Sequence, residues 1–284
     1  MEEQYKFILK NFSLTVGIII VRACTLVMPI AWSDITHVTK VDPAKDLPAD
    51  LDVIGHTDLV IVGGSDGVTT ENSLQTIEDI HTRFPELPLF QEPYSSSHVS
   101  TETIEAVDVL SIPAVYNGDR DNFVAKHVDF FTEIGRKPEE VPGTGLPFVG
   151  DLIASRGRDT ITTISEKILG EGYVVQNSGS KAAKESSVKT AYSPERVAGA
   201  ALATEALYRF PIFYIEYSGT YGGPEDVKAA APYLDDTVLF YGGGIESHQQ
   251  TQEILDAGAD AVVVGDCFHE APDQYLETVP NASG

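Results

Sequence analysis

The chain has 284 residues, 42% of them hydrophobic, so it can bury the core of one large domain or of two small ones. Its 43 Asp and Glu residues against 19 Lys and Arg give a net charge of −24, which argues against binding nucleic acid or an anionic membrane through general electrostatics. The composition fits an acidic soluble enzyme, and we favour the narrower interpretation of a halophilic protein, whose hydrated acidic surface keeps it in solution at high salt.

The two cysteines, Cys24 and Cys267, are far apart in the sequence and have no CxxC spacing. We therefore expect neither a disulfide framework nor a zinc site. A reducing, cytoplasmic location fits this cysteine usage.

The first 27 residues differ from the rest of the chain. The stretch from Phe12 to Trp32 is mostly apolar and just long enough for a transmembrane helix, but Arg22 at its middle costs about 2.5–3.5 kcal/mol on insertion scales. No A-x-A cleavage site follows, so a signal peptide fits poorly. We expect residues 1–27 to be an extension without catalytic importance, translation to start at Met28, and no stable membrane span. An added packing segment and a membrane contact are the alternatives.

Apolar runs in the first half of the remaining chain predict strands. They are His37–Val41, Asp58–Val62, Leu87–Phe90 and Asp108–Ile112, the last ended by Pro113. Helices are predicted after the second strand, over Phe123–Ile134 and over Asp159–Leu169, with a turn-rich stretch at Pro138–Gly150. The helical signal after the third strand, around Thr101–Ala106, is thin, so we expect the third helix to be shortened or missing.

Four further strands are predicted in the second half, at Gly172–Val175, Ile212–Tyr217, Val238–Gly242 and Ala261–Val264. A polar stretch, Ser178–Ser193, indicates a loop. Helices are expected to begin at Ser193-Pro194, at Pro224 and at Ser247, where Gln250 completes a capping box.

Eight strands that alternate with helices, each continuously apolar, indicate parallel strands covered on both faces. A single (β/α)₈ TIM barrel over residues 28–284 is the fold that we predict. An open doubly wound sheet is the alternative, and we favour it less because no G-x-G-x-x-G follows the first strand.

Glycines end three consecutive predicted strands, at Ser218-Gly219, Gly242–Gly244 and Gly265. In such barrels a phosphate commonly binds after strands seven and eight, where Gly243, Gly244, Gly265 and Asp266 fall. These residues predict a phosphate site, although the glycines could serve only the tight turns.

Charged residues near the strand ends give further candidates. Glu216 lies inside an apolar strand, where an ionised carboxylate is costly unless it is paired or used. Asp42 and Ser65 end neighbouring strands and could hold Mg²⁺, whose oxygen shell is usually completed by substrate phosphates. The alternatives are an ordinary turn at Asp42 and an ordinary surface charge at Lys40. We expect His37 and His269 to be structural.

Several motifs together resemble those of the geranylgeranylglyceryl phosphate synthase family, especially its haloarchaeal members, and their bacterial heptaprenylglyceryl phosphate synthase relatives. The resemblance runs from about Trp32 to Glu270, with its motifs in the family's order. The motifs are Thr39-Lys-Val-Asp-Pro43, Val62-Gly-Gly-Ser-Asp-Gly-Val68, Tyr214-Ile-Glu-Tyr-Ser-Gly219, Leu239-Phe-Tyr-Gly-Gly-Gly-Ile245 and Ala259-Asp-Ala-Val-Val-Val-Gly265.

The resemblance implies an Mg²⁺-dependent prenyltransferase of archaeal membrane-lipid synthesis. Such an enzyme joins the geranylgeranyl group of geranylgeranyl diphosphate to the 3-hydroxyl of sn-glycerol 1-phosphate. It implies that Asp42 and Ser65 hold the metal, that Glu216 and Tyr214 are catalytic, and that the protein is a homodimer. The residues implied to bind glycerol phosphate are Lys40, Tyr214, Ile215, Glu216, Tyr217, Ser218, Gly219, Gly243, Gly244, Gly265 and Asp266.

Two departures from the family's pattern are visible. Asp266 stands where the bacterial relatives have Asn, so we expect its backbone N–H to bind phosphate and its side chain to turn away. Asn177-Ser178 replaces an expected Asn-Pro, which puts the role of the following loop in doubt. We expect an apolar groove for the prenyl tail at the thinned third unit, lined by Leu89, Phe90, Ile112 and Tyr116.

Two other classes stay open. One is a phosphosugar isomerase or aldolase-like barrel, which would need a Schiff-base lysine or an opposed acid and base. The other is a non-catalytic phosphate-binding protein, which the presence of Glu216, Asp42 and Ser65 disfavours.

Overall fold

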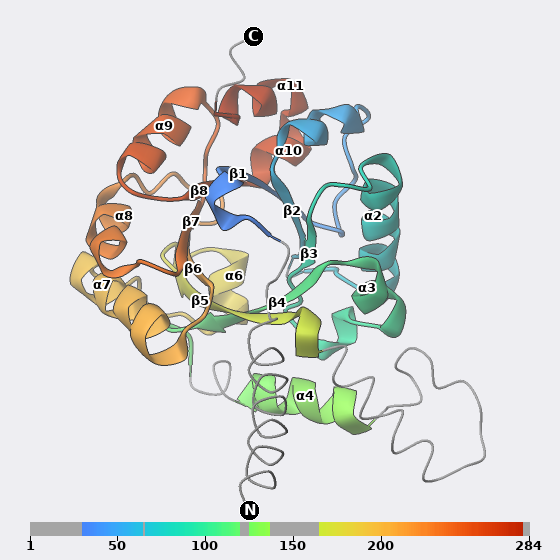
Figure 1. Ribbon diagram of the computed structural model, residues 1–284, viewed down its shortest axis with the longest axis horizontal. Helices are drawn as coiled ribbons and strands as arrows, with labels where there is room; N and C mark the ends of the chain where they lie inside the picture. The colour runs from blue at the N-terminus through green and yellow to red at the C-terminus, as the bar shows by residue number, and fades with distance from the viewer. Residues whose placement is uncertain (1–29, 65, 120–124, 137–164, 281–284) are drawn as a thin grey trace, which may run out of the picture. The chain divides into compact units, whose positions relative to one another are not determined.

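The computed structural model describes residues 30–64, 66–119, 125–136 and 165–280. Eight parallel strands close into a barrel in which each strand pairs with the next and β8 pairs with β1 (Figure 1). The strands are β1 (His37–Val41), β2 (Leu59–Val62), β3 (Leu89–Gln91), β4 (Val109–Val115), β5 (Ile168–Val175), β6 (Ile212–Glu216), β7 (Val238–Gly242) and β8 (Ala261–Val264). The predicted TIM barrel is confirmed, and the open sheet is wrong.

Helices ring the barrel. They are α2 (Thr70–Arg83), α3 (Thr101–Ala106), α4 (Lys126–Arg136), α6 (Lys181–Glu185), α7 (Pro194–Ala203), α8 (Glu225–Ala230), α9 (His248–Asp256), α10 (Asp266–Glu270) and α11 (Pro272–Tyr275). The third helix is short as predicted, with 6 residues in α3 against 14 in α2. None of the helices in the described ranges is long and apolar enough to cross a bilayer.

Three sequence predictions need correction. Strand β4 does not end before Pro113 but runs through it to Val115. Gln91, the last residue of β3, pairs with Leu110, so Pro113 lies where β4 no longer has β3 beside it and a missing N–H is tolerated. Ile168 and Leu169 belong to β5, not to a helix, and the supposed loop after β5 contains α6, which Ser180 caps.

Some predictions fall outside the described residues. They are the extension at residues 1–27 with Cys24, the start at Met28, the metal ligand Ser65, the turn-rich stretch 138–150, and residues 159–164 of the predicted helix.

The main core lies between the barrel wall and the helices. Phe213 and Ile215 on β6, Val262 and Val264 on β8, and Ile77 on α2 pack there with at most 2% of their surface exposed. Inside the barrel, Phe90 and Phe240 are fully buried and the Trp32 ring contacts both. Side chains alternate along each strand, so the residues between those of the outer core point into the barrel.

Replacing Phe213 with Ala tests this core. Phe213 is fully buried, so the cavity should lower the free energy of unfolding by about 3–5 kcal/mol. Phe131→Ala on α4 is the matched control, because Phe131 is 46% exposed and its loss should cost within about 0.5 kcal/mol. Chemical denaturation of both variants measures the difference, and equal losses would contradict the placement of the core.

Candidate functional site

A pocket of about 480 Å³ lies at the carboxyl ends of the barrel strands. It collects residues from six strands, β1 and β4 to β8, and from the turns after the strands, so positions that are far apart in the sequence meet there. The predicted site residues that line it are Lys40, Asp42, Tyr214, Glu216, Ser218, Gly219, Gly243, Gly244, Gly265 and Asp266.

Two predicted site residues do not line this pocket with their side chains. The Ile215 side chain is fully buried in the outer core and therefore points away from the pocket. The Tyr217 hydroxyl donates a hydrogen bond to Asp226 at 2.6 Å, beside Gln176, which donates to the same carboxylate oxygen at 2.5 Å. Tyr217 therefore anchors the turn after β6 onto α8.

Glu216 lies on β6 with 6% of its surface exposed, and its carboxylate accepts three hydrogen bonds. Tyr173 on β5 donates its hydroxyl to Oε2 at 2.9 Å, while Ser218 donates its backbone N–H to Oε1 at 2.6 Å and its hydroxyl at 3.0 Å. These bonds explain how an ionised carboxylate is tolerated in an apolar strand. They also fix the direction in which its remaining lone pairs face.

Lys40 on β1 enters the same network. Its Nζ donates to Oε1 of Glu92 at 2.7 Å and to the Tyr173 hydroxyl at 3.4 Å, and it lies 5.4 Å from the centre of the Tyr214 ring. Burial lowers the pKa of Lys40, but the carboxylates of Glu92 and Glu216 outweigh burial and raise it above the ordinary value. Lys40 is therefore an ammonium that faces the pocket.

Glu92 and Tyr173 are site residues that we did not predict. Glu92 directly follows the apolar strand β3, so the signal that singled out Glu216, an acid at the end of an apolar run, could have found it. Tyr173 carries no such signal, because a tyrosine in a strand is typical of the core. Burial and the charge of Glu216 raise the pKa of both Tyr173 and Tyr214 well above the ordinary value, so both hydroxyls stay protonated.

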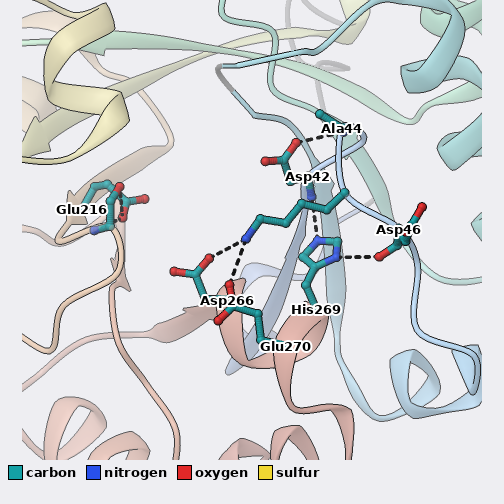
Figure 2. A network of polar contacts seen from close by, with 9 residues as sticks. Asp42, Ala44, Asp46, Glu216, Asp266, His269 and Glu270 are labelled. Carbon is teal, nitrogen blue, oxygen red and sulfur yellow. Dashed lines mark hydrogen bonds and ion pairs between the residues drawn. The ribbon is translucent and has the colours of Figure 1, made fainter.

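Polar contacts across the rim hold the ends of β1 and β8 together (Figure 2). The backbone N–H of Asp42 donates to Nε2 of His269 at 3.0 Å, and Nδ1 of His269 is 3.1 Å from the carbonyl of Asp46. Burial lowers the pKa of His269, so the ring is neutral and Nδ1 carries the proton. These bonds tie His269 to the segment after β1, and its side chain also lines the pocket, so its structural role stays a prediction.

Asp266 has its charge engaged at the rim, since Nζ of Lys45 lies 2.9 Å from its carboxylate and 3.5 Å from that of Glu270. This ion pair weakens the repulsion that a free carboxylate would exert on a phosphate in the pocket. It fits the expectation that the Asp266 side chain takes no direct part in phosphate binding.

Glycines shape the turn after β7. Gly244 has φ +60°, a left-handed conformation that favours glycine, and a Cβ there would overlap the backbone N of Tyr221. A Cβ at Gly242 would overlap the Tyr214 hydroxyl. The glycines thus let the β7 turn pack against β6 and its loop, and they expose backbone beside the pocket.

The side chains at this site could bind a metal ion together with substrate phosphates, but the described residues do not form a complete metal site by themselves. No group of three His, Cys, Asp or Glu side chains that could hold an ion occurs among residues 30–64, 66–119, 125–136 and 165–280. Mg²⁺ usually takes only one or two carboxylates together with substrate phosphates, and Asp42 lines the pocket with its carboxylate against Gly64 of the β2 turn. A shared site of this kind fits the residues present.

A second pocket of about 250 Å³ adjoins the first and shares Tyr94, Pro113, Val115 and Ser186 with it. It lies between the β3 loop and α4, and Ile112 and Phe130 supply apolar surface. Of the four predicted groove residues only Ile112 lines it. Leu89 and Phe90 are buried in the core, and the Tyr116 hydroxyl bonds with Thr204.

Comparison with known proteins places these features in context. The PcrB family matches residues 30–283. Heptaprenylglyceryl phosphate synthase of Bacillus pumilus is 36% identical over 247 residues, 86% of this chain and 94% of the relative. Geranylgeranylglyceryl phosphate synthase of Methanocella arvoryzae is 33% identical over 248 residues, 85% of this chain and 93% of the relative.

Among solved structures, the (S)-3-O-geranylgeranylglyceryl phosphate synthase of Thermoplasma acidophilum, in complex with its substrate sn-glycerol-1-phosphate, superposes with a TM-score of 0.64. The superposition covers 87% of this chain and 91% of that one, at 20% identity. This likeness supports the fold.

Exchanging Gly244 for Ala tests the β7 turn. The positive φ and the overlap with Tyr221 should lower the free energy of unfolding by at least about 1–3 kcal/mol. Gly199→Ala is the matched control, because Gly199 lies in α7 and an added Cβ would meet no atom within 4 Å. Ala should raise the free energy of unfolding there by roughly 0.5–1 kcal/mol. Denaturant midpoints compare the two, and a harmless change at Gly244 would show that the turn does not need glycine.

Proposed function

Because the chain belongs to the PcrB family, we propose that it transfers the geranylgeranyl group of geranylgeranyl diphosphate to the 3-hydroxyl of sn-glycerol 1-phosphate. One observation carries the proposal. The paired carboxylate Glu216 lies at the wall of a pocket that also contains the glycine turns after β7 and β8 and the ammonium of Lys40. This arrangement offers a base, a phosphate site and a cation in one place.

The phosphate of glycerol phosphate binds at the turns after β7 and β8, through backbone N–H groups around Gly244 and Gly265. Lys40 adds a charge-assisted hydrogen bond from β1, the strand that pairs with β8. Ser218 and Gly219 close the third side. With the phosphate held there, the far end of the glycerol extends toward Glu216 and Tyr214.

Glu216 is the general base. As the glycerol 3-hydroxyl attacks the allylic carbon, a C–O ether bond forms, the bond from that carbon to the diphosphate oxygen breaks, and the hydroxyl proton passes to Glu216. Tyr173 and Ser218 hold the carboxylate in direction, and Tyr214 orients the glycerol. Holding the hydroxyl in line with the allylic carbon supplies much of the rate.

Mg²⁺ is the proposed cofactor, held by Asp42 and Ser65 together with the diphosphate. When bound, the ion neutralises charge on the leaving diphosphate. Asp42 faces the pocket, which Lys45 and Lys181 also line; a bound diphosphate would compete with Asp266 and Asp66 for these two ammonium groups. The backbone bond to His269 fixes the position of Asp42.

The adjoining pocket of about 250 Å³ is the proposed start of the groove for the prenyl tail. It opens from the main pocket past Tyr94 and Pro113, so a tail there lies next to the allylic carbon. The relatives' names indicate geranylgeranyl and heptaprenyl donors, and we propose geranylgeranyl diphosphate on the sequence resemblance to the archaeal enzymes.

The two competing classes have less support. A Schiff-base lysine needs a lowered pKa to present a neutral amine, whereas the pKa of Lys40 is raised. A non-catalytic phosphate-binding protein would not need a buried carboxylate such as Glu216 next to the phosphate-binding turns.

We extend the proposal to features that depend on sequence evidence. The enzyme domain comprises residues 28–284, supported by the family match over 30–283, and residues 1–27 are an extension. The acidic composition supports a halophilic, cytoplasmic protein. The family resemblance supports a homodimer.

Replacing Glu216 with Gln tests the role of the base. Turnover should fall by about 10²–10⁴-fold, since Gln cannot accept the proton, while binding of sn-glycerol 1-phosphate should persist. Glu225→Gln on the exposed side of α8 is the matched control and should keep full turnover. Product formation and calorimetric binding are measured on all three proteins. Undiminished turnover in Glu216→Gln would remove Glu216 from the mechanism.

A further inference from the structure

A second acid lies deeper in the barrel, below the proposed base. Glu171 is on β5, two residues before Tyr173, so both side chains point into the barrel. Glu171 is completely buried, and Oε1 accepts a hydrogen bond from the Ser111 hydroxyl on β4. Its other oxygen, Oε2, has no hydrogen-bond partner among the described residues.

Glu92 also has one carboxylate oxygen without a hydrogen-bond partner among the described residues. Its Oε1 is paired with Lys40, but its Oε2 is buried and likewise lacks a partner within the described part of the chain. The strand order places β4, which carries Ser111, between β3 and β5, so the two acids flank Ser111 inside the barrel. Two buried acceptors without donors are costly, and one proton between them satisfies both.

We propose that Glu171 is a neutral carboxylic acid that donates its proton to Oε2 of Glu92 and so acts as a positioning residue for the Lys40–Glu92 pair. The chain of contacts then runs from Ser111 through Glu171 and Glu92 to Lys40, and every carboxylate oxygen along it has a partner. Glu171 itself does not touch the substrate.

The electrostatics of the interior agree with this geometry. Burial raises the pKa of Glu171 to about 8, and the charge of Glu92 acts in the same direction. The charged or titratable groups whose interactions with Glu171 are resolved are Lys40 on β1, Glu92 on β3, Tyr173 on β5 and Tyr214 on β6. Both tyrosines stay neutral, and Lys40 only partly offsets the burial.

The proton on Glu171 should affect the affinity for anionic substrates. This part of the argument rests on the proposed function. With Glu171 neutral, the single ammonium of Lys40 interacts with two carboxylates, those of Glu92 and Glu216. Ionised Glu171 would add a third carboxylate beneath a bound phosphate. The KM for sn-glycerol 1-phosphate should therefore rise several-fold above pH 8, while kcat at saturation stays constant because Glu171 is remote from the reacting atoms.

The proton also has a signature that does not depend on activity. The folded chain holds the Glu171 proton up to about pH 8, whereas the unfolded chain releases it near the ordinary pKa of a glutamate, so unfolding releases a proton between these values. The folded state binds more protons in this window, and stability therefore falls as pH rises through it. Glu171→Gln keeps a neutral amide that can donate to Glu92 and should abolish that part of the fall.

The deciding experiment is ¹³C NMR of the full chain labelled at the glutamate carboxyl carbon, with the Glu171 signal assigned by its loss in Glu171→Gln. A protonated carboxyl at pH 7 that titrates near pH 8 is the expected result. An ionised Glu171 at pH 7 would overturn the proposal, whether or not the protein is active.

Kinetics and stability supply the positioning test. Glu171→Gln should show a KM and an unfolding midpoint that change less between pH 7 and 9 than those of the wild type, with kcat unchanged. Glu171→Leu, which removes the donor, should raise KM at every pH, and Glu166→Gln on the exposed surface is the control. A protonated Glu171 whose replacement by Leu leaves KM unchanged would overturn the positioning role. A wild type without turnover would sink the proposed function and leave the proton to be decided by NMR.

Discussion

The burial of Glu216 is the constraint on which the site depends. A carboxylate on an interior strand position is stable only if the barrel supplies donors for it. Tyr173 from β5 and the turn at Ser218 do so. The same tyrosine contacts Lys40, whose ammonium is in turn held by Glu92, so four strand ends share one set of charges. Loss of the Lys40–Glu92 contact would leave two buried charges without their ion pair, which is costly.

The barrel explains why these charges meet. Parallel strands present their carboxyl ends at one mouth. Lys40 on β1, Glu92 after β3, Tyr173 on β5, and Tyr214 and Glu216 on β6 meet there. The part of the mouth between β6 and β1, at β7 and β8, contributes backbone in place of side chains, because Gly242 makes room for Tyr214 and Gly244 for the loop after β6. Glycine turns flanked by the charged side chains of Glu216 and Lys40 suit a substrate with a phosphate at one end and a reacting hydroxyl at the other.

Sequence reasoning recovered the parts of this picture that local patterns encode. The eight strands were predictable because each contains a run of mainly apolar residues, but the first half of β5 was missed. Glu216 was predictable because an acid interrupts such a run. Tyr173 and Glu171 were not predictable, because their roles depend on which side chains neighbouring strands direct into the barrel. Pro113 misled the prediction of the end of β4, because proline is tolerated where β3 has already ended. α6 was missed because five residues carry too little periodicity to stand out from a polar loop.

The central claim is that this pocket joins a prenyl group to one stereoisomer of glycerol phosphate. The most direct measurement is a product assay at high salt with Mg²⁺ and geranylgeranyl diphosphate, offering sn-glycerol 1-phosphate or its sn-3 isomer as the acceptor. The account predicts an ether-linked product from the sn-1 isomer and none from the sn-3 isomer or without Mg²⁺. A folded protein that binds neither isomer, or that forms no ether from the sn-1 isomer with either geranylgeranyl or heptaprenyl diphosphate, would contradict it.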